Sequence, residues 1–156
     1  MMSHPWYERR FIWLFFLILA PQLFGMVLIP FSGTSEPRYA EIARMMAESG
    51  DWITPWFEPG VPFWGKPPLS FWVQALSIRL FGLDEWAVRF PSLLAFLAIL
   101  AVIHTVARRY AGLRAAFWAV IVYASCALPY IAGIAVLTDP FLALGTTLCM
   151  AGFVLG

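Results

Sequence analysis

The carboxylate of Asp139 is the strongest chemical signal in this sequence of 156 residues. It is the only charged side chain between residues 115 and 156, a stretch that is mostly apolar. A lone acid in such a stretch is costly in lipid and usually faces the interior of a helix bundle, where it can act as a general base. The simpler interpretation is helix capping, because Thr138 and Asp139 before Pro140 form a helix-start signal.

Lys66 is the second candidate, because it precedes two prolines and a predicted short helix that ends before Gly82. The free backbone amides of Leu69 and Ser70, the helix dipole and the ammonium group would together attract a phosphate. A lysine that only reaches towards the membrane–water interface explains the same residue. The apolar residues at helical spacing are Leu69, Trp72, Val73, Leu76 and Leu80.

Glu36 is the third candidate and begins a predicted helix over residues 36–46, which Ser35 can cap. This helix should lie along the membrane surface, with Arg44 and Glu48 paired on its wet side. On the charges alone, an ordinary solvated helix face is the favoured interpretation. The apolar stripe of this helix consists of Tyr39, Ile42, Ala43 and Met46.

The segments that position these residues are predicted to cross a membrane. Apolar residues make up 62% of the sequence and charged residues 12%, against roughly 45–50% and 25% in soluble domains. We predict transmembrane helices at 11–31, 90–107, 115–134 and 140–156, and a large loop over 32–89. The predicted fold is therefore all-α integral membrane, with four transmembrane helices and two short amphipathic juxtamembrane helices in the first outer loop. A signal peptide is the alternative for 11–31, but this run exceeds the roughly 7–15 residues of its apolar region.

The distribution of charge predicts the orientation. The amino-terminal tail and the 108–114 loop carry five arginines and one acid, whereas the 32–89 segment and the turn at Asp139 carry five basic and eight acidic residues. By the positive-inside rule, the amino terminus is cytoplasmic, and the long loop shares the outer face with Asp139. Because the chain ends inside an apolar run, we expect it to be the amino-terminal part of a longer protein.

Other classes of site find little support. The net charge of +1 gives no basic field for nucleic acid. Cys126 and Cys149 lie in apolar runs without metal or redox spacing, and we predict that they are small core residues. His104 lies one turn from Arg108 and is interpreted as interfacial. The sequence contains no metal-ligand cluster, nucleophile elbow or glycine-rich phosphate loop.

The order of these motifs resembles the amino-terminal part of the polyprenyl-phosphate-dependent GT-C glycosyltransferases, in particular the lipid A aminoarabinose transferase branch and its protein mannosyltransferase relatives. The similarity extends over nearly the whole chain. The matching stretches are Ser35-Glu36-Pro37-Arg38-Tyr39-Ala40-Glu41-Ile42-Ala43-Arg44, Ser49-Gly50-Asp51-Trp52 with Pro55, Lys66-Pro67-Pro68-Leu69 with Leu80-Phe81-Gly82, Arg89-Phe90-Pro91-Ser92 and Thr138-Asp139-Pro140.

This resemblance implies a multi-pass enzyme of the bacterial inner membrane that moves a sugar from a polyprenyl phosphate to a lipid A-like or protein acceptor at the periplasmic face. It implies that Glu36 and Asp139 are the catalytic acids and that Lys66 contacts the carrier phosphate. Arg38, Tyr39 and Ser35 would complete the substrate-binding residues, by their positions in the motif. The implied partners are the sugar donor, the acceptor and membrane lipid.

Two positions depart from the family pattern. Ser35 stands where the family usually has the Asp of an Asp-Glu pair, and Gly65 stands where many relatives have an acid. Gly65 counts against a divalent metal, the one cofactor that the resemblance leaves open. Together the departures also allow an alternative function, a non-catalytic lipid-carrier-binding or assembly subunit derived from the family. A transporter is disfavoured, because no inverted repeat or pair of broken helices is present.

Overall fold

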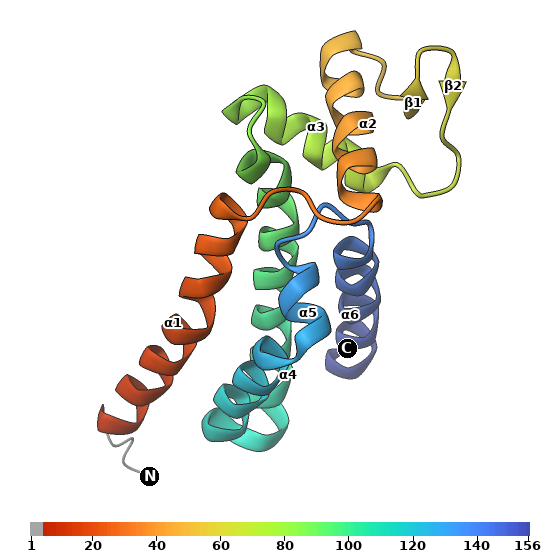
Figure 1. The fold of residues 1–156 in the computed structure, drawn as a ribbon. Helices are drawn as coiled ribbons and strands as arrows, with labels where there is room; N and C mark the ends of the chain where they lie inside the picture. The colour runs from red at the N-terminus through yellow and green to blue at the C-terminus, as the bar shows by residue number, and fades with distance from the viewer. Residues whose placement is uncertain (1–4) are drawn as a thin grey trace.

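A computed structural model of the chain describes residues 5–156. Helices α1, α4 and α6 run alongside one another, while α2, α3 and a small hairpin gather at one end, which we call the head, residues 29–84 (Figure 1). The chain is thus almost entirely helical, as the sequence predicts. The elements in these residues are α1 (Pro5–Leu28), α2 (Ser35–Ser49), β1 (Trp56–Glu58), β2 (Val61–Pro62), α3 (Leu69–Phe81), α4 (Glu85–Ser125), α5 (Ala127–Ala132) and α6 (Asp139–Leu155).

Two of the described helices are long and apolar enough to cross a membrane. The segments that meet this test are Arg9–Leu28 in α1 and Glu85–Ser125, the whole of α4, while α3 and α6 are apolar but shorter. α1 corresponds to the predicted span at 11–31 and continues through Pro21. The neighbouring Gln22 is fully buried and donates a hydrogen bond to the carbonyl of Tyr130 at 2.7 Å. This bond ties α1 to α5.

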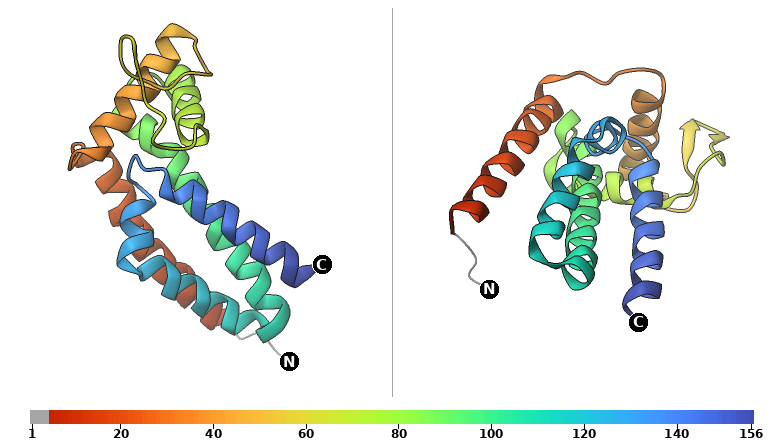
Figure 2. Two further views of the ribbon diagram at one scale, coloured as in Figure 1. Left: turned by 90° about the vertical axis from the view of Figure 1, so that its right-hand side faces the viewer. Right: turned by 90° about the horizontal axis from the view of Figure 1, so that it is seen from below.

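α4 reverses direction at Gly112, so it consists of two antiparallel arms (Figure 2). The backbone of Gly112 has φ 85° and ψ 173°, a region in which a side chain would be strained. The predicted spans at 90–107 and 115–134 fall on the two arms, and the predicted loop between them is a tight turn. The first arm begins at Glu85, five residues before the predicted start at Phe90.

The second arm ends earlier than predicted, at Ser125, and α5 follows as a separate short helix. Pro129 has no backbone N–H to bond to the carbonyl of Ser125, which weakens a continuous helix at this point. The chain instead takes an extended conformation at Cys126, and Pro129 falls in the first turn of α5, where no N–H is required. The predicted helix over 115–134 was therefore wrong as a single uninterrupted element.

The core of the head forms where α2 and α3 pack together and against Val88 and Val136. The predicted stripe of α2 is confirmed, because Tyr39, Ile42, Ala43 and Met46 are all buried. The predicted cap by Ser35 is wrong: Thr34 occupies the N-cap position, and no side chain caps the helix. Arg44 does pair with Glu48, and also with Glu41.

α3 buries the face opposite to its predicted apolar stripe. Phe71, Ala75 and Ile78 are buried, together with Ser70, Gln74 and Ser77. The reason is that α3 is apolar on both faces, and one of them packs on α2 and α4. The other face is left for lipid. Its exposed large apolar residues are Leu69, Trp72, Leu76 and Leu80.

Two further features of the structure differ from the sequence analysis. Cys126 and Cys149 are exposed, so the prediction of small core residues was wrong. The hairpin of β1 and β2 was not predicted. It follows a turn organised by Asp51, whose carboxylate accepts hydrogen bonds from the backbone of Ile53 and Thr54 and from the indole of Trp56.

Candidate functional site

Asp139 is the first residue of α6, preceded by Thr138 at the N-cap position and followed by Pro140. Proline fits the first helical turn, and a carboxylate there is stabilised by the helix dipole. The helix-start signal in the sequence is therefore confirmed. Asp139 is nevertheless exposed, and no side-chain cap bond forms at this helix start. Its carboxylate remains available to a ligand.

Lys66 and Asp139 line the same groove, which measures about 540 Å³. Lys66 comes from the head, just before α3, and Asp139 comes from the start of α6, 73 positions later in the chain. Within residues 5–156, the structure shows no ion pair between either residue and a protein group. The groove is polar at Lys66 and Asp139 and apolar along α6. Its lining is Lys66, Pro67, Leu69, Ser70, Thr138, Asp139, Phe141, Leu142, Gly145, Thr146, Cys149 and Met150.

The start of α3 adds hydrogen-bond donors to the Lys66 side of this groove. The helix begins at Leu69 after Pro68, so the first backbone amides have no partner within the helix. Ser70 also lines the groove, and its buried hydroxyl has no hydrogen-bond partner in the described structure. An ammonium group and free amides on one side of a groove form a suitable seat for a phosphate.

Glu36, in the first turn of α2, is buried and fully engaged. Its side chain is 8% exposed. Oε2 accepts hydrogen bonds from the backbone amide of Ser32 at 2.8 Å and from its hydroxyl at 3.3 Å. Oε1 accepts from the backbone amide of Val136 at 2.9 Å. This bond connects the start of α2 to the segment that leads into α6.

Arg89, in the first arm of α4, is the charged partner of Glu36. The side chain is 3% exposed, and its guanidinium donates to both carboxylate oxygens, at 3.3 and 3.4 Å. It also donates to the carbonyls of Met26 and Ile29 at the end of α1, and it stacks over the ring of Phe31 at 4.9 Å. Arg89 therefore joins α1, α2 and α4.

The environment of Glu36 holds its carboxyl group in the charged form. Burial alone would raise its pKa, but the backbone hydrogen bonds from Ser32 and Val136 and the hydrogen bond and charge of Arg89 act in the opposite direction. The net result is a pKa below the ordinary value for glutamate. A carboxylate with this pKa and these partners is a weak proton acceptor.

The remaining predicted site residues lie outside the groove lining. Arg38 is exposed, and its guanidinium stacks over the ring of Phe57 at 5.6 Å. Tyr39 is buried against the rings of Phe63 and Phe71. Ser35 is half-buried at the start of α2. Their roles in substrate binding stay predictions.

Comparison with known proteins identifies the family. The sequence profile of the dolichyl-phosphate-mannose-protein mannosyltransferase family matches residues 65–155, more than half of the chain. The chain belongs to this family.

The most informative relatives of this chain are bacterial aminoarabinose transferases. The undecaprenyl phosphate-alpha-4-amino-4-deoxy-L-arabinose arabinosyl transferase of Edwardsiella ictaluri is 41% identical over 78% of this chain and 22% of its own length. The enzyme of the same name from Aeromonas salmonicida is 32% identical over 96% of this chain and 26% of its own length. The chain thus spans about a quarter of the length of the curated relatives it matches.

Solved structures agree with this membership. The crystal structure of ArnT from Cupriavidus metallidurans bound to undecaprenyl phosphate superposes with a TM-score of 0.85 and 28% identity, over 97% of this chain and 27% of that one. The apo structure of the same protein gives a TM-score of 0.82 over 95% of this chain and 27% of that one. This chain therefore has the all-α membrane fold of the GT-C class. With its two apolar helices, it is a protein of the bacterial inner-membrane type.

No metal centre is evident in the described part of the chain. Residues 5–156 contain no group of three His, Cys, Asp or Glu side chains close enough to hold an ion. Glu36 is occupied by Arg89 and by backbone amides, and Gly65 contributes no ligand. The described residues therefore supply no ligand set for a divalent cation.

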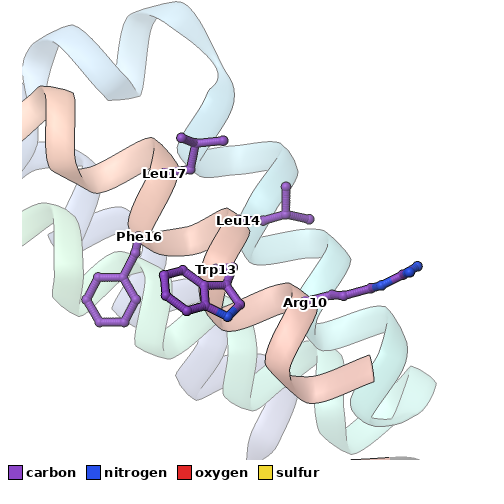
Figure 3. Close-up of a pocket in the computed structure, with 5 residues that line it drawn as sticks. All are labelled: Arg10, Trp13, Leu14, Phe16 and Leu17. Carbon is purple, nitrogen blue, oxygen red and sulfur yellow. The ribbon is translucent and has the colours of Figure 1, made fainter. Parts of the chain in front are cut away.

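A larger hollow, of about 680 Å³, lies against α1 and is not a candidate for chemistry (Figure 3). All the residues that line it belong to this one helix, and Trp13 among them is 74% exposed. It holds no acid and no opposing wall from another element, which is typical of a helix surface covered by lipid. The lining is Arg10, Trp13, Leu14, Phe16 and Leu17.

The role of Arg89 as the partner of Glu36 was not predicted from the sequence. Arg89 appeared there only as part of a matching stretch, with no role. A signal was present, because an arginine at the border of an apolar run is costly unless it is paired. Its partner could not be read, because Glu36 lies 53 positions away.

Proposed function

We propose that this chain forms the amino-terminal part, residues 1–156, of a membrane glycosyltransferase. The enzyme would move a sugar from a polyprenyl phosphate carrier to a lipid A-like or protein acceptor. Two findings support this class of donor: the names of the aminoarabinose transferase relatives, and the undecaprenyl phosphate bound to the solved structure that this chain resembles. The observation that carries the proposal is the groove shared by Lys66 and Asp139.

The residues of the groove suit the two ends of the reaction. The oxygen of the acceptor hydroxyl attacks the anomeric carbon, and the bond from that carbon to the phosphate oxygen breaks. The departing phosphate keeps the electron pair, and Lys66 and the amides at the start of α3 stabilise its charge. Asp139 accepts the proton of the hydroxyl. Direct in-line attack inverts the anomeric centre.

The proposed topology has four spans, formed by α1, the first arm of α4, the second arm of α4 together with α5, and α6. The arginine-rich turn at Gly112 and the amino terminus would be cytoplasmic, and the head and Asp139 would be periplasmic. α6 has 17 residues, about 26 Å at helical rise, which is close to the thickness of the hydrocarbon core. The apolar lining of the groove along α6 would then be continuous with the membrane, from which a polyprenyl chain could enter.

The test is sugar transfer by the complete gene product. Asp139→Asn and Lys66→Ala should each lower the transfer rate by about 100-fold or more, because they remove a general base and a phosphate-binding charge. Glu41→Gln and Arg44→Ala are matched controls on the exposed face of α2 and should leave the rate unchanged. Full activity in both groove variants would refute the proposed site.

A second candidate, a non-catalytic subunit that binds the lipid carrier, is favoured by Ser35, because the resemblance implies an acid at this position. Ser35→Asp separates the two functions. A protein that is already active should change little. A large gain in transfer would mean that the native protein is catalytically impaired, in agreement with the second candidate.

A further inference from the structure

The segment between α5 and α6, residues 133–138, determines where Asp139 lies. It has no regular secondary structure, and its backbone is held by short-range bonds such as that from the amide of Leu137 to the carbonyl of Ala135. Val136, at its centre, is fully buried. The amide of Val136 donates to Glu36. Without this carboxylate, a buried N–H would lose its partner, which native structures rarely tolerate.

Glu36 can hold Val136 because Glu36 is itself fixed. It sits at the start of α2 and is held by Ser32 on one side and by Arg89 on the other. Arg89 in turn is anchored to the carbonyls of Met26 and Ile29. The hydrogen-bonded chain therefore runs from α1 and α4, through Glu36, to a backbone amide three residues before Asp139.

This arrangement does not suit Glu36 to the catalytic role that the sequence suggested. Both carboxylate oxygens already accept hydrogen bonds, and the side chain is almost inaccessible. A base must reach the acceptor hydroxyl, and Asp139 is exposed to the groove whereas Glu36 is not part of its lining. The contacts of Glu36 are those of a residue that acts through another.

We propose that Glu36 is a positioning residue: with Arg89, it fixes the amide of Val136 and so holds the 133–138 segment in the form that presents Asp139 to the groove. The effect on the segment follows from the contacts alone. The effect on turnover rests on the proposed function.

Hydrogen–deuterium exchange of the complete gene product tests the structural part, without any substrate. Glu36→Gln keeps the size of the side chain but removes its charge and replaces one acceptor oxygen by a donor. Peptides that cover residues 134–138 should exchange at least about tenfold faster, because a charge-assisted hydrogen bond is weakened. Peptides from the second arm of α4 should not change. Glu41→Gln, on the same helix but paired with Arg44 at the surface, is the control and should match the native protein.

Steady-state kinetics test the catalytic part. If Glu36 positions Asp139, Glu36→Gln should lower kcat by about tenfold or more and leave the KM for the polyprenyl phosphate donor within about twofold, because Lys66 and α3 are unaffected. Unchanged exchange at 134–138 would overturn the positioning role, and unchanged exchange with a lost kcat would return Glu36 to a chemical role. If the native protein transfers no sugar, the proposed function fails, while the exchange result still decides the role of Glu36.

Discussion

The Glu36–Arg89 pair and the Lys66–Asp139 groove contain the same kinds of charged group in opposite surroundings. In the pair, both side chains are buried, and the carboxylate oxygens and the guanidinium are hydrogen-bonded. In the groove, the carboxylate and the ammonium group are exposed and have no ion pair in the described structure. The difference shows that the type of residue does not assign its role. A carboxylate whose oxygens are all hydrogen-bonded within the protein organises the chain around it, whereas a carboxylate without such partners can take part in chemistry.

The largest loss of stability is expected when the cation of the buried pair is removed. Arg89→Met should destabilise the protein by about 3–5 kcal/mol, because Glu36 is left as a buried charge and the carbonyls at the end of α1 lose a donor. Chemical unfolding in detergent measures this loss. A change of less than about 1 kcal/mol would mean that the pair does not hold the head to α1 and α4.

The pH dependence of stability tests whether Glu36 is charged and paired in the native protein. Its pKa is lowered in the native state, so its contribution to stability is complete at neutral pH. That contribution is lost as the pH falls from the ordinary glutamate value of about 4.3 through the lower native value. The difference in Tm between the native protein and Glu36→Gln should therefore shrink as the pH is lowered from 6 to 3. A difference that is constant over this range would contradict the charged, paired state of Glu36.

The smallest effect on stability is expected in the groove. Asp139→Asn and Lys66→Met should change the free energy of unfolding by no more than about 0.5 kcal/mol, because neither side chain is buried or paired. The asparagine can also keep the helix start, since it is a good residue at a helix amino terminus. The same unfolding assay applies. A loss comparable to that of Arg89→Met would assign the groove residues to the framework of the fold.

Much of the fold follows from local patterns in the sequence. Uncharged runs of membrane length predict α1 and α6, and Gly112 among arginines predicts the turn of α4. The prediction of the apolar stripe of α2 is correct because the other face of that helix is polar. The buried face of α3 could not be chosen, because both of its faces are apolar and only the packing on α2 and α4 decides between them.

The site was predictable only in part, for a physical reason. Asp139 and Lys66 stand out because each is a charge beside apolar residues or a helix start, and such signals are local. The partners of Glu36 are not local: Arg89 is 53 positions away, and Val136 is 100 positions away. No periodicity encodes these contacts, so the sequence presented Glu36 as a free acid, and the tertiary structure shows a paired one.

The most direct test of the groove is the binding of undecaprenyl phosphate to the purified complete gene product. The proposed phosphate seat predicts that Lys66→Met raises Kd by about tenfold or more, the usual effect of losing a charge-assisted contact. Arg44→Met, which removes the same charge from the exposed face of α2, should change Kd by less than about twofold. Equal affinities of the native protein and Lys66→Met would contradict the assignment of the groove to the carrier phosphate.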